Sequence, residues 1–593
     1  MAALFTTPKR NDTTAGTHVA EPDVRRRIGL AHGSWRRVTR RIVAGAVCAL
    51  TVSSLLMPSV SLAAEWVKVG GNKYNTAASD EAGTWSWDGA DDLKLNNYNG
   101  GEIQAAGKLN VNYSGTNIVT AEWIESIKVS HGTNENAELN IQGDEGGTLS
   151  VTSTEDAILS TGNINIDGAG SVNATSTGFD AINAGGDLAI KGSGNVNATG
   201  ASDGIRANGN ITIDDSGAVT ARATKDKGIG ADKNLTIKGG GTVEASSADG
   251  EALWSGGNIN ISDGSQVKAS SEKDAAVEAK GSLAVTNASL DASGVEYGVY
   301  AYKGVTLDHA TVMVRTSANG GQAIALITDG DDIVIKNGST VDAFAEGEVS
   351  AAFSTRNDRP NEKGGHIYIS DSVVKAIARY VENGDGPIPY SENQDGETRR
   401  EPQGENIGII AQTSEGVTPA VISIIRSKVT AEGDTAAIFA RAMSADGKTI
   451  GTIKIENAAI QTPEGGKVID YRKLRDGIYE AGQAIGTGDA TVDSLYIKAV
   501  AKSTTIAPPE VAKPEDPKPD ETKPAESKPA ESKQNPKPEG SKPTKAVAAS
   551  TTKAKTTGVL AATGDTSGAA IVATVLAGTA AIAAGTMASR KRS

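Results

Sequence analysis

Short segments in which apolar and polar residues alternate recur along most of the middle of the chain. In one repeat, Leu235 and Ile237 form a first apolar pair, Val243 and Ala245 form a second, and a third segment centres on Leu253. Alternation with a period of two predicts β-strands, and the Gly, Asn and Asp residues between the segments predict tight turns. The repeats show no helical period, so the pattern predicts three short strands per repeat.

The first of the three segments returns at a nearly constant spacing between residues 139 and 332. Successive starts are 25, 24, 23, 24, 24, 24 and 22 residues apart, at Leu139, Ile164, Leu188, Ile211, Leu235, Ile259, Leu283 and Val305. Such a period predicts a solenoid, whose units bury their apolar faces only by stacking. Three strands per coil fit an all-β, right-handed parallel β-helix with coils about 4.8 Å apart. Leucine-rich repeats share the period, but their Leu/Asn frame is missing, and a β-sandwich would not repeat so regularly.

The inward positions of successive coils should stack into columns. The second-strand columns are Val172, Val196, Val219, Val243 and Val267, beside Ala174, Ala198, Ala221, Ala245 and Ala269. Small Ala beside Val allows a narrow coil to close at native packing density. The coil joints carry Asn163, Asp187, Asn210, Asn234 and Asn258. These residue types tolerate left-handed backbone and bond turn amides, so we expect them to have a structural role.

The regular repeat is flanked by less regular sequence on both sides. Residues 65–138 are predicted to form an N-terminal β cap and the first coils, and residues 139–505 to form the parallel β-helix with inserted loops. The N-terminal region is rich in tryptophan, at Trp66, Trp85, Trp87 and Trp123. Later strands should start at Ile333, Ile367, Ile422, Ile453 and Leu495. The longest insertion runs from Glu382 to Asn406, and such insertions often shape a binding face.

Both ends of the chain carry segments typical of an exported protein. Basic residues precede an apolar run from Ile42 to Leu56, and small residues follow up to Ala64. This order predicts a signal peptide over residues 1–64. The only cysteine, Cys48, lies within it, so the core must form without disulfides. Residues 506–556 are rich in Pro, Lys and Glu and have too few apolar residues for a core, which predicts a disordered, extended stalk.

The final segment, residues 557–593, combines three features. It contains Leu560, Ala561, Ala562, Thr563 and Gly564, then an apolar run from Ala569 to Ala588, and then Arg590-Lys591-Arg592. The run has membrane-spanning length as a helix, and the basic tail would stay on the cytoplasmic side. This arrangement resembles the sorting signal of Gram-positive surface proteins, in the Leu-Ala-x-Thr-Gly form of actinobacteria. The resemblance implies cleavage after Thr563 by a sortase, and secretion followed by covalent anchoring to cell-wall peptidoglycan. A simple membrane anchor is the alternative, but the run is only weakly apolar.

Charge restricts the partners of the exported part. The whole chain has a net charge of −14, and residues 1–64 carry +6 of it, so the remaining residues carry −20. So acidic a chain argues against nucleic acid and anionic membranes as partners. It suits cations and neutral or basic surfaces, although solubility alone also explains it.

A row of charged residues precedes the third inward position of successive coils. It reads Asp156, Asp180, Asp203, Lys227 and Glu251. Carboxylates on neighbouring coils would stand one strand spacing apart, and oxygen-rich sets of this kind suit Ca²⁺. Asp156, Asp180 and Asp203 are therefore candidate calcium ligands. The alternative, favoured by the interruption at Lys227, is that each carboxylate accepts hydrogen bonds from its own turn amides.

The neighbouring outward column offers a candidate carbohydrate site. It reads Leu159, Asn183, Arg206, Gly230, Trp254, Glu278 and Tyr300, and Tyr297 and Tyr302 join it. Aromatic residues are only 4% of the chain, so this gathering stands out. Trp254 and Tyr300 would lie about 10 Å apart, as do alternate units of a β-linked glycan. The candidate carbohydrate-binding residues are thus Trp254, Glu278, Tyr297, Tyr300 and Tyr302. Scattered surface aromatics are the alternative.

Repeat units such as those beginning at Asp203 and Gly228 resemble bacterial surface β-helix proteins that bind carbohydrate. The resemblance covers about residues 139–345 and implies a β-helix that binds polysaccharide and calcium without catalysis. The sequence holds only five histidines and no metal-ligand pair, phosphate loop or serine nucleophile elbow. We therefore expect a monomeric, non-catalytic polysaccharide binder or adhesin, with a polysaccharide or host-surface glycan as partner. The alternatives are a polysaccharide lyase using Asp180, Asp203 and Arg206, and a passive structural protein.

Overall fold

The computed structural model describes residues 63–509, except 134–136, 319–320, 358–364, 382–390, 393–397, 400–404, 446, 476, 489–490 and 494–497. All described residues belong to one compact unit, which ends at Ala512. Its regular elements are β-strands alone, and no helix of this part is long and apolar enough to cross a membrane. The predicted signal peptide up to residue 62, all but the start of the stalk, and the sorting segment lie outside the described residues.

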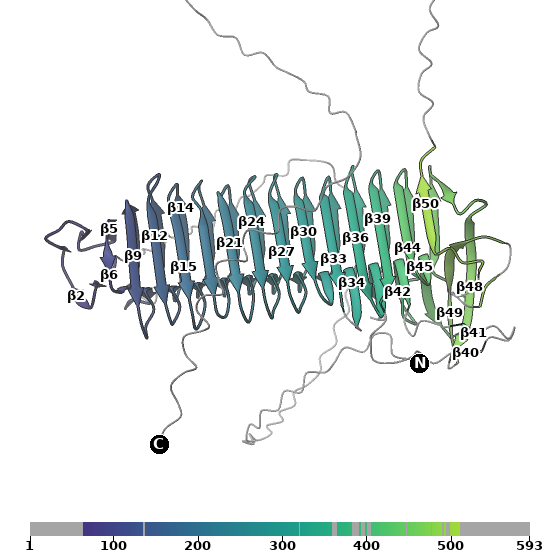
Figure 1. Ribbon diagram of the computed structural model, residues 1–593, viewed down its shortest axis with the longest axis horizontal. Coiled ribbons are helices and arrows are strands. Elements are labelled where there is room, and N and C mark those ends of the chain that lie inside the picture. Colours follow the sequence, from purple (N-terminus) through teal and green to yellow (C-terminus); the bar gives the residue numbers. More distant parts are fainter. Residues whose placement is uncertain are drawn as a thin grey trace, which may run out of the picture. The chain divides into compact units, whose positions relative to one another are not determined.

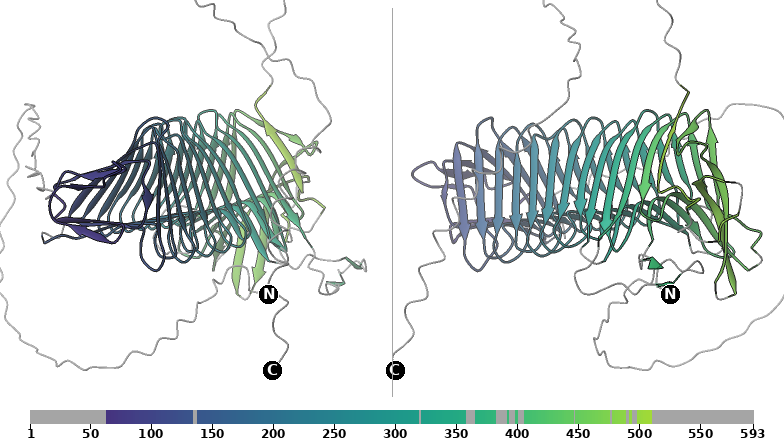
Figure 2. Two further views of the ribbon diagram at one scale, coloured as in Figure 1. Left: turned by 60° about the vertical axis from the view of Figure 1, so that its left-hand side comes forward. Right: turned by 45° about the vertical axis from the view of Figure 1, so that its right-hand side comes forward.

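The strands form three long sheets that run side by side along a stack of coils (Figure 1). Strands of neighbouring coils pair in parallel and in register, as Leu235 does with Ile259. Figure 2 shows the coils stacked one behind the other, with their turns aligned at the corners. The arrangement is solenoid-like and consistent with the predicted parallel β-helix.

Each coil contributes one strand to each sheet. In pairing order, the first sheet contains β3 (Ala78–Ser79), β4 (Trp85–Trp87), β5 (Asp92–Asn96), β8 (Lys108–Ser114), β11 (Glu138–Gly143), β14 (Asn163–Gly168), β17 (Leu188–Lys191), β20 (Ile211–Asp214), β23 (Leu235–Lys238), β26 (Ile259–Ser262), β29 (Leu283–Thr286), β32 (Val305–Asp308), β35 (Ile333–Lys336), β38 (Ile367–Ser370), β43 (Val421–Ile425) and β46 (Thr452–Glu456). The second sheet contains β6 (Asn99–Gly100), β9 (Thr116–Ala121), β12 (Thr148–Ser153), β15 (Ser171–Ser176), β18 (Val196–Gly200), β21 (Ala218–Ala223), β24 (Thr242–Ser247), β27 (Gln266–Ser271), β30 (Ser289–Gly294), β33 (Thr311–Ser317), β36 (Thr340–Gly347), β39 (Val373–Tyr380), β44 (Lys428–Gly433), β50 (Ser503–Ala507) and β47 (Ala459–Thr462).

The third sheet contains β2 (Asn72–Tyr74), β1 (Trp66–Val69), β7 (Ile103–Ala106), β10 (Ile127–Ser130), β13 (Ile158–Ser160), β16 (Ile182–Ala184), β19 (Ile205–Ala207), β22 (Ile229–Ala231), β25 (Leu253–Ser255), β28 (Val277–Ala279), β31 (Tyr297–Ala301), β34 (Gln322–Asp329), β37 (Val349–Asn357), β42 (Asn406–Thr413), β45 (Ala436–Ser444), β49 (Ile478–Gly486) and β48 (Lys467–Arg475). A separate antiparallel pair, β40 (Ser391–Glu392) and β41 (Thr398–Arg399), lies within the long insertion. The predicted strand start at Leu495 lies outside the described residues.

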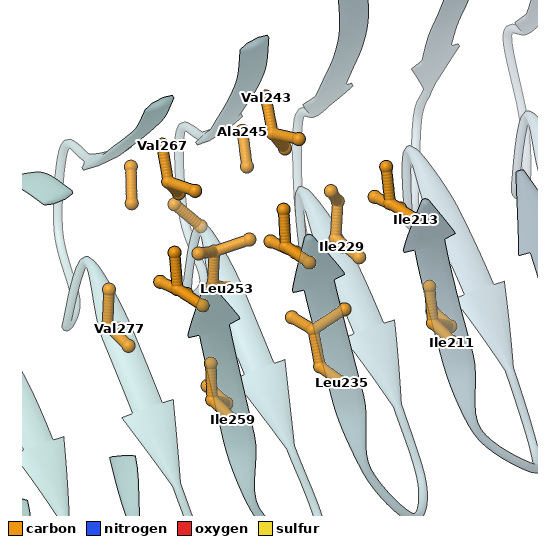
Figure 3. Close-up of a cluster of buried hydrophobic side chains, with 14 of the residues drawn as sticks. Ile211, Ile213, Ile229, Leu235, Val243, Ala245, Leu253, Ile259, Val267 and Val277 are labelled. Carbon is orange, nitrogen blue, oxygen red and sulfur yellow. The ribbon is translucent and has the colours of Figure 1, made fainter. Parts of the chain in front are cut away.

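The predicted columns form the core between the three sheets. All eight residues of the first column and all ten of the second are at most 3% exposed. Figure 3 shows Ile211, Leu235 and Ile259 at equivalent positions of successive strands, with Val243 and Val267 nearby. Every coil therefore buries its apolar residues against its neighbours, as the repeat period predicts.

The side chains of the joint residues accept hydrogen bonds from backbone amides of the next coil rather than from their own turn. The amide N–H of Asp187 donates to Asn163 Oδ1 at 2.9 Å, and that of Asn210 donates to Asp187 Oδ1 at 2.7 Å. The ladder continues at Asn234 and Asn258. Each side chain thus replaces a ladder hydrogen bond where the chain leaves one sheet for the next. The predicted hydrogen-bonding role of these positions is confirmed, whereas none of the five residues has a left-handed backbone.

Antiparallel strands end the stack on both sides. At the N-terminal end β1 pairs with β2 and β7, and β4 pairs with β3 and β5. Trp85 and Trp87 are buried there, whereas Trp123 is 81% exposed and takes no part in the cap. At the C-terminal end β45 pairs with β49, and β44 with β50. The parallel stack therefore ends before residue 505, where the repeat pattern placed its boundary.

The later coils carry a second apolar cluster outside the third sheet. We call it the outer apolar stripe, and its members on β34, β37, β42 and β45 are Ile324, Ile327, Ala351, Ile407, Ile410, Ala436 and Phe439. All are buried. At one end Phe439 packs edge-on against Tyr471, with ring centroids 5.1 Å apart. At the other end Tyr297 and Tyr300 pack against the stripe.

Candidate functional site

The outward column of the third sheet has the register predicted from the repeats. Parallel pairing aligns Leu159, Asn183, Arg206, Gly230, Trp254, Glu278 and Tyr300 on consecutive strands from β13 to β31. Leu253 and Ser255 are buried in the solenoid, and side chains alternate along a strand, so Trp254 between them faces outward. The next outward residue is Ile327, the start of the outer apolar stripe.

The three tyrosines form one packed cluster. The Tyr297 and Tyr300 ring centroids are 5.0 Å apart, and the Tyr300 and Tyr302 rings stack at 4.4 Å. The Tyr300 hydroxyl donates to Asp329 Oδ2 at 3.4 Å, and Arg356 Nε donates to Asp329 Oδ1 at 3.0 Å. The rings are half-buried rather than fully exposed. We call Trp254, Glu278, Tyr297, Tyr300 and Tyr302 the aromatic face.

Lysine side chains lie over the outer rings. Lys280 Nζ lies 4.1 Å from the centroid of the Tyr302 ring and donates to its hydroxyl at 2.9 Å. Lys227 Nζ lies 5.3 Å from the centroid of the Trp254 ring. Both contacts fall in the range of cation–π attraction. The face therefore combines rings with flexible hydrogen-bond donors that a ligand could displace or use.

A pair of carboxyl groups lies beside Trp254. Glu278 is 8% exposed, shares a hydrogen bond with Glu251 and forms an ion pair with Lys280. Burial, with that hydrogen bond and the charge of Glu278, raises the pKa of Glu251 to about 7. Sequence reasoning placed Glu251 in the acidic row and Glu278 in the aromatic column, but it did not bring them together.

The aspartate row is a hydrogen-bonded ladder. The amide N–H of Asp180 donates to Asp156 Oδ1 at 3.0 Å, and that of Asp203 donates to Asp180 Oδ1 at 2.9 Å. Lys227 N–H continues the ladder to Asp203. Asn183 Nδ2 donates to the second oxygens of Asp156 and Asp180 at 3.1 and 3.0 Å. The carboxylates thus accept amide hydrogen bonds, as the alternative interpretation proposed, but from the next coil.

The described residues of the aspartate ladder do not form a cluster of metal-binding side chains. In the part of the chain that the structure describes, no group of three or more His, Cys, Asp or Glu side chains surrounds a common point. Burial, outweighing the amide bond from Lys227, raises the pKa of Asp203 to about 6. The expectation of calcium at Asp156, Asp180 and Asp203 gains no support from this geometry.

Arg206, the base of the lyase alternative, is held between two carboxylates. It lies 3.4 Å from Asp203 Oδ2 and 3.0 Å from Asp232 Oδ1. Burial alone would lower its pKa, but Asp232 and Asp203 more than offset burial, and the pKa is raised. A general base must lose its proton near the working pH, and this environment opposes that loss.

Two exposed rings were missed as site candidates. Trp123 is 81% exposed and Phe179 is 51% exposed, both at the corner between the second and third sheets. The sequence pattern places Trp123 in the N-terminal cap and assigns no role to Phe179. Their signal in the sequence was a large apolar side chain at a corner that other coils fill with Ser202, Asp226 or Gly250.

The comparisons with known proteins do not assign the chain to a family. No family model, no curated protein and no solved structure matches the chain. The sorting residues Leu560, Ala561, Ala562, Thr563 and Gly564, and most of the insertion between Glu382 and Asn406, lie outside the described residues.

Proposed function

We propose that this chain is a wall-anchored surface protein whose solenoid binds polysaccharide, as an adhesin, without catalysing a reaction. The observation that carries the binding proposal is the aromatic face. Trp254, Glu278 and Tyr300 occupy one column on three consecutive strands, with two further tyrosines against the last of them. Rings of this kind offer broad apolar contact to the C–H face of a sugar, while their hydroxyls and the nearby carboxyls offer hydrogen bonds.

The setting of the rings favours binding. Trp254 stands on a strand paired on both sides, and Tyr300 is tethered through Asp329 and packed on the outer apolar stripe. Side chains already held in place lose little conformational freedom when a ligand arrives. The face thus suits the shallow, repeated contacts of an extended glycan better than a compact ligand.

Two features favour binding over catalysis. The raised pKa of Arg206 opposes its use as the base of a lyase. Glu251 and Glu278 share a hydrogen bond, whereas the carboxyl groups of retaining glycosidases stand about 5 Å apart. We therefore keep the lyase and the passive structural protein as outcomes of the binding test.

A glycan array tests this function directly. The exported chain should retain one class of polysaccharide, and the retention should survive a chelator, because the aspartate ladder is satisfied without a metal. Retention that requires Ca²⁺ would restore Asp156, Asp180 and Asp203 as ligands. Shortening of a bound polymer would favour the lyase, and an array without any signal would favour the passive structural protein.

Wall anchoring is proposed from the sequence alone. In this scheme residues 1–64 direct export, the coils wind with the usual right hand, residues 506–556 span the wall, and Thr563 is joined to peptidoglycan. Thr563→Ala should release the protein to the membrane or medium. Thr557→Ala is a matched control, because Thr557 also precedes a glycine but lacks the preceding Leu-Ala-x. Unchanged release of the Thr563→Ala protein by wall-digesting enzyme would contradict the scheme.

A further inference from the structure

Two exposed rings share one corner of the solenoid, far along the stack from the aromatic face. Trp123 lies between β9 and β10, and Phe179 lies between β15 and β16. The pairing of Ile127 with Ile158, and of Ile158 with Ile182, places the two corners two coils apart. The corners themselves are thus about 9.6 Å apart at two strand spacings.

The backbone holds both rings outward. Trp123 has a φ of 71°, a left-handed conformation that bulky residues rarely adopt. Its N–H donates to Thr154 Oγ1 of the next coil at 3.0 Å. The Phe179 N–H donates to Ser176 Oγ at 2.9 Å. Unfavourable backbone conformations persist mostly where function needs them, and here the conformation presents a tryptophan to solvent.

The same side of the stack joins this corner to the aromatic face. The register that starts at Ile127 continues through every coil to Val299, beside Tyr300. Seven strand spacings separate these two coils, which is about 34 Å. Asn183 and Arg206 occupy the outward column between Phe179 and Trp254 and supply polar contacts.

The charges along this path favour one kind of glycan. Glu122 is exposed beside Trp123, and Glu155 is half-buried at the next corner. Three cations along the path are each paired with a carboxylate: Arg206 with Asp203 and Asp232, Lys227 with Asp226, and Lys280 with Glu278. An anionic polymer would meet carboxylates beside Trp123 and would have to displace a carboxylate to gain one of these cations, whereas an uncharged polymer would not.

We propose that a single linear, uncharged, β-linked hexose polymer lies along the stack and contacts Trp123, Phe179, Trp254 and Tyr300. This inference rests on the proposed polysaccharide-binding function, and it adds the direction, the minimum length and the charge class of the ligand. At about one unit per strand spacing, the path accommodates roughly seven hexose units. Phe179 and Trp254 lie on coils three strand spacings apart, which is about 14 Å, so an oligomer of three units reaches only one of the two ring groups.

The test measures binding of the full chain to β-1,4-linked glucose and mannose oligomers of three and eight units, with polygalacturonate as the anionic probe. The eight-unit oligomer of at least one series should bind at least about tenfold more tightly than the three-unit one, because the second ring group adds a contact. The double variant Trp123→Ala, Phe179→Ala should lose that gain and keep the three-unit affinity. The double variant Trp254→Ala, Tyr300→Ala should weaken binding of both lengths.

Tyr368→Ala is the matched control, because Tyr368 is a partly exposed ring on the first sheet, away from the path. Equal affinity for both lengths, or full affinity of the Trp123→Ala, Phe179→Ala protein for eight units, would overturn the axial path and leave the proposed function standing. Tighter binding of polygalacturonate would overturn the charge class. Failure of all these probes, with a different glycan retained on the array, would overturn the inference alone. Failure on the array as well would overturn the proposed function.

Discussion

The regular coils and the later coils use the outer side of the third sheet differently. In the regular coils the third strand has three residues, as in β13 and β22, and its single outward residue is polar or small in most coils. In the later coils β34, β37, β42 and β45 have eight or nine residues, and the outer apolar stripe covers their outer side. The aromatic face lies at the change, because Tyr300 pairs with Ile327 of the stripe.

This difference shows how one part of a repeat fold can present a surface that its other coils lack. The interior of the regular coils repeats the same apolar columns, so it does not distinguish one regular coil from another. The outward positions of these coils lie outside the columns, and their residues differ from coil to coil, as Asn183, Arg206 and Trp254 do. Tyr297 and Tyr300 are anchored by the apolar stripe on one side, while Trp254 keeps polar neighbours on the other.

The largest expected effect concerns the interior of a regular coil. Ile237 is 1% exposed, and Ile237→Asp would bury a charge without a partner. We expect it to lower the free energy of unfolding by at least about 4 kcal/mol, measured by chemical denaturation. Thr236→Asp, on the outward side of the same strand, is the control and should change stability little. A tolerated Ile237→Asp would contradict the assigned core.

A smaller effect separates buried from exposed ion pairs in the later coils. Arg441, 7% exposed as a residue, lies 3.0 Å from Glu405 and also donates to Gln412. Arg441→Ala should cost about 3 kcal/mol of unfolding free energy, because Glu405 would lose its partner. Arg426→Ala, which removes an exposed pair with Asp371, should have little effect. Equal losses in the two variants would show that burial does not distinguish the pairs.

The outer apolar stripe can be tested against the outward face of a regular coil. Ile410 is 4% exposed although it faces away from the solenoid interior. Ile410→Ala should cost about 2–3 kcal/mol of unfolding free energy, as for an interior isoleucine. Thr212→Ala, at an outward position of β20, is the comparison and should be nearly neutral. A neutral Ile410→Ala would mean that the stripe is not a closed core.

The smallest expected effect is a pH dependence of stability. The folded-state pKa of Glu251, about 7, lies above the ordinary glutamate value of 4.5, so the folded protein binds the proton more tightly than the unfolded chain. The contribution of Glu251 is therefore fully present below pH 4.5 and is lost as the pH rises through about 7. Glu251→Gln should show a smaller fall in the melting temperature over this window. Glu244→Gln, at an exposed position of β24, should keep the original profile.

The repeat period accounts for what the sequence could predict. Columns such as Leu235 and Ile259 follow from alternation and spacing, and they fix which residues face outward, including Trp254 and Tyr300. The outer apolar stripe could not be predicted in the same way. Consecutive buried residues such as Ile409 and Ile410 face opposite sides of one sheet, and period-two alternation does not describe them.

The fine structure of the candidate site also depends on contacts between coils. The aspartate ladder requires the amide of one coil to meet the carboxylate of another, as Asp203 meets Asp180. The pairing of Glu251 with Glu278 depends on side-chain directions at a corner, which spacing alone does not give. Composition places Trp123 in the cap, but it lies at a corner between β9 and β10 with a left-handed backbone, which composition does not predict.

The most direct test of polysaccharide binding is the affinity of Trp254→Ala, Tyr300→Ala protein for the glycan retained on the array. Calorimetric titration of this variant, of the unchanged chain and of Tyr368→Ala would compare the aromatic face with a ring outside it. We predict a loss of at least about tenfold for the double variant and no change for Tyr368→Ala. Full affinity of the double variant, with its fold intact, would contradict the assignment of the site to the aromatic face.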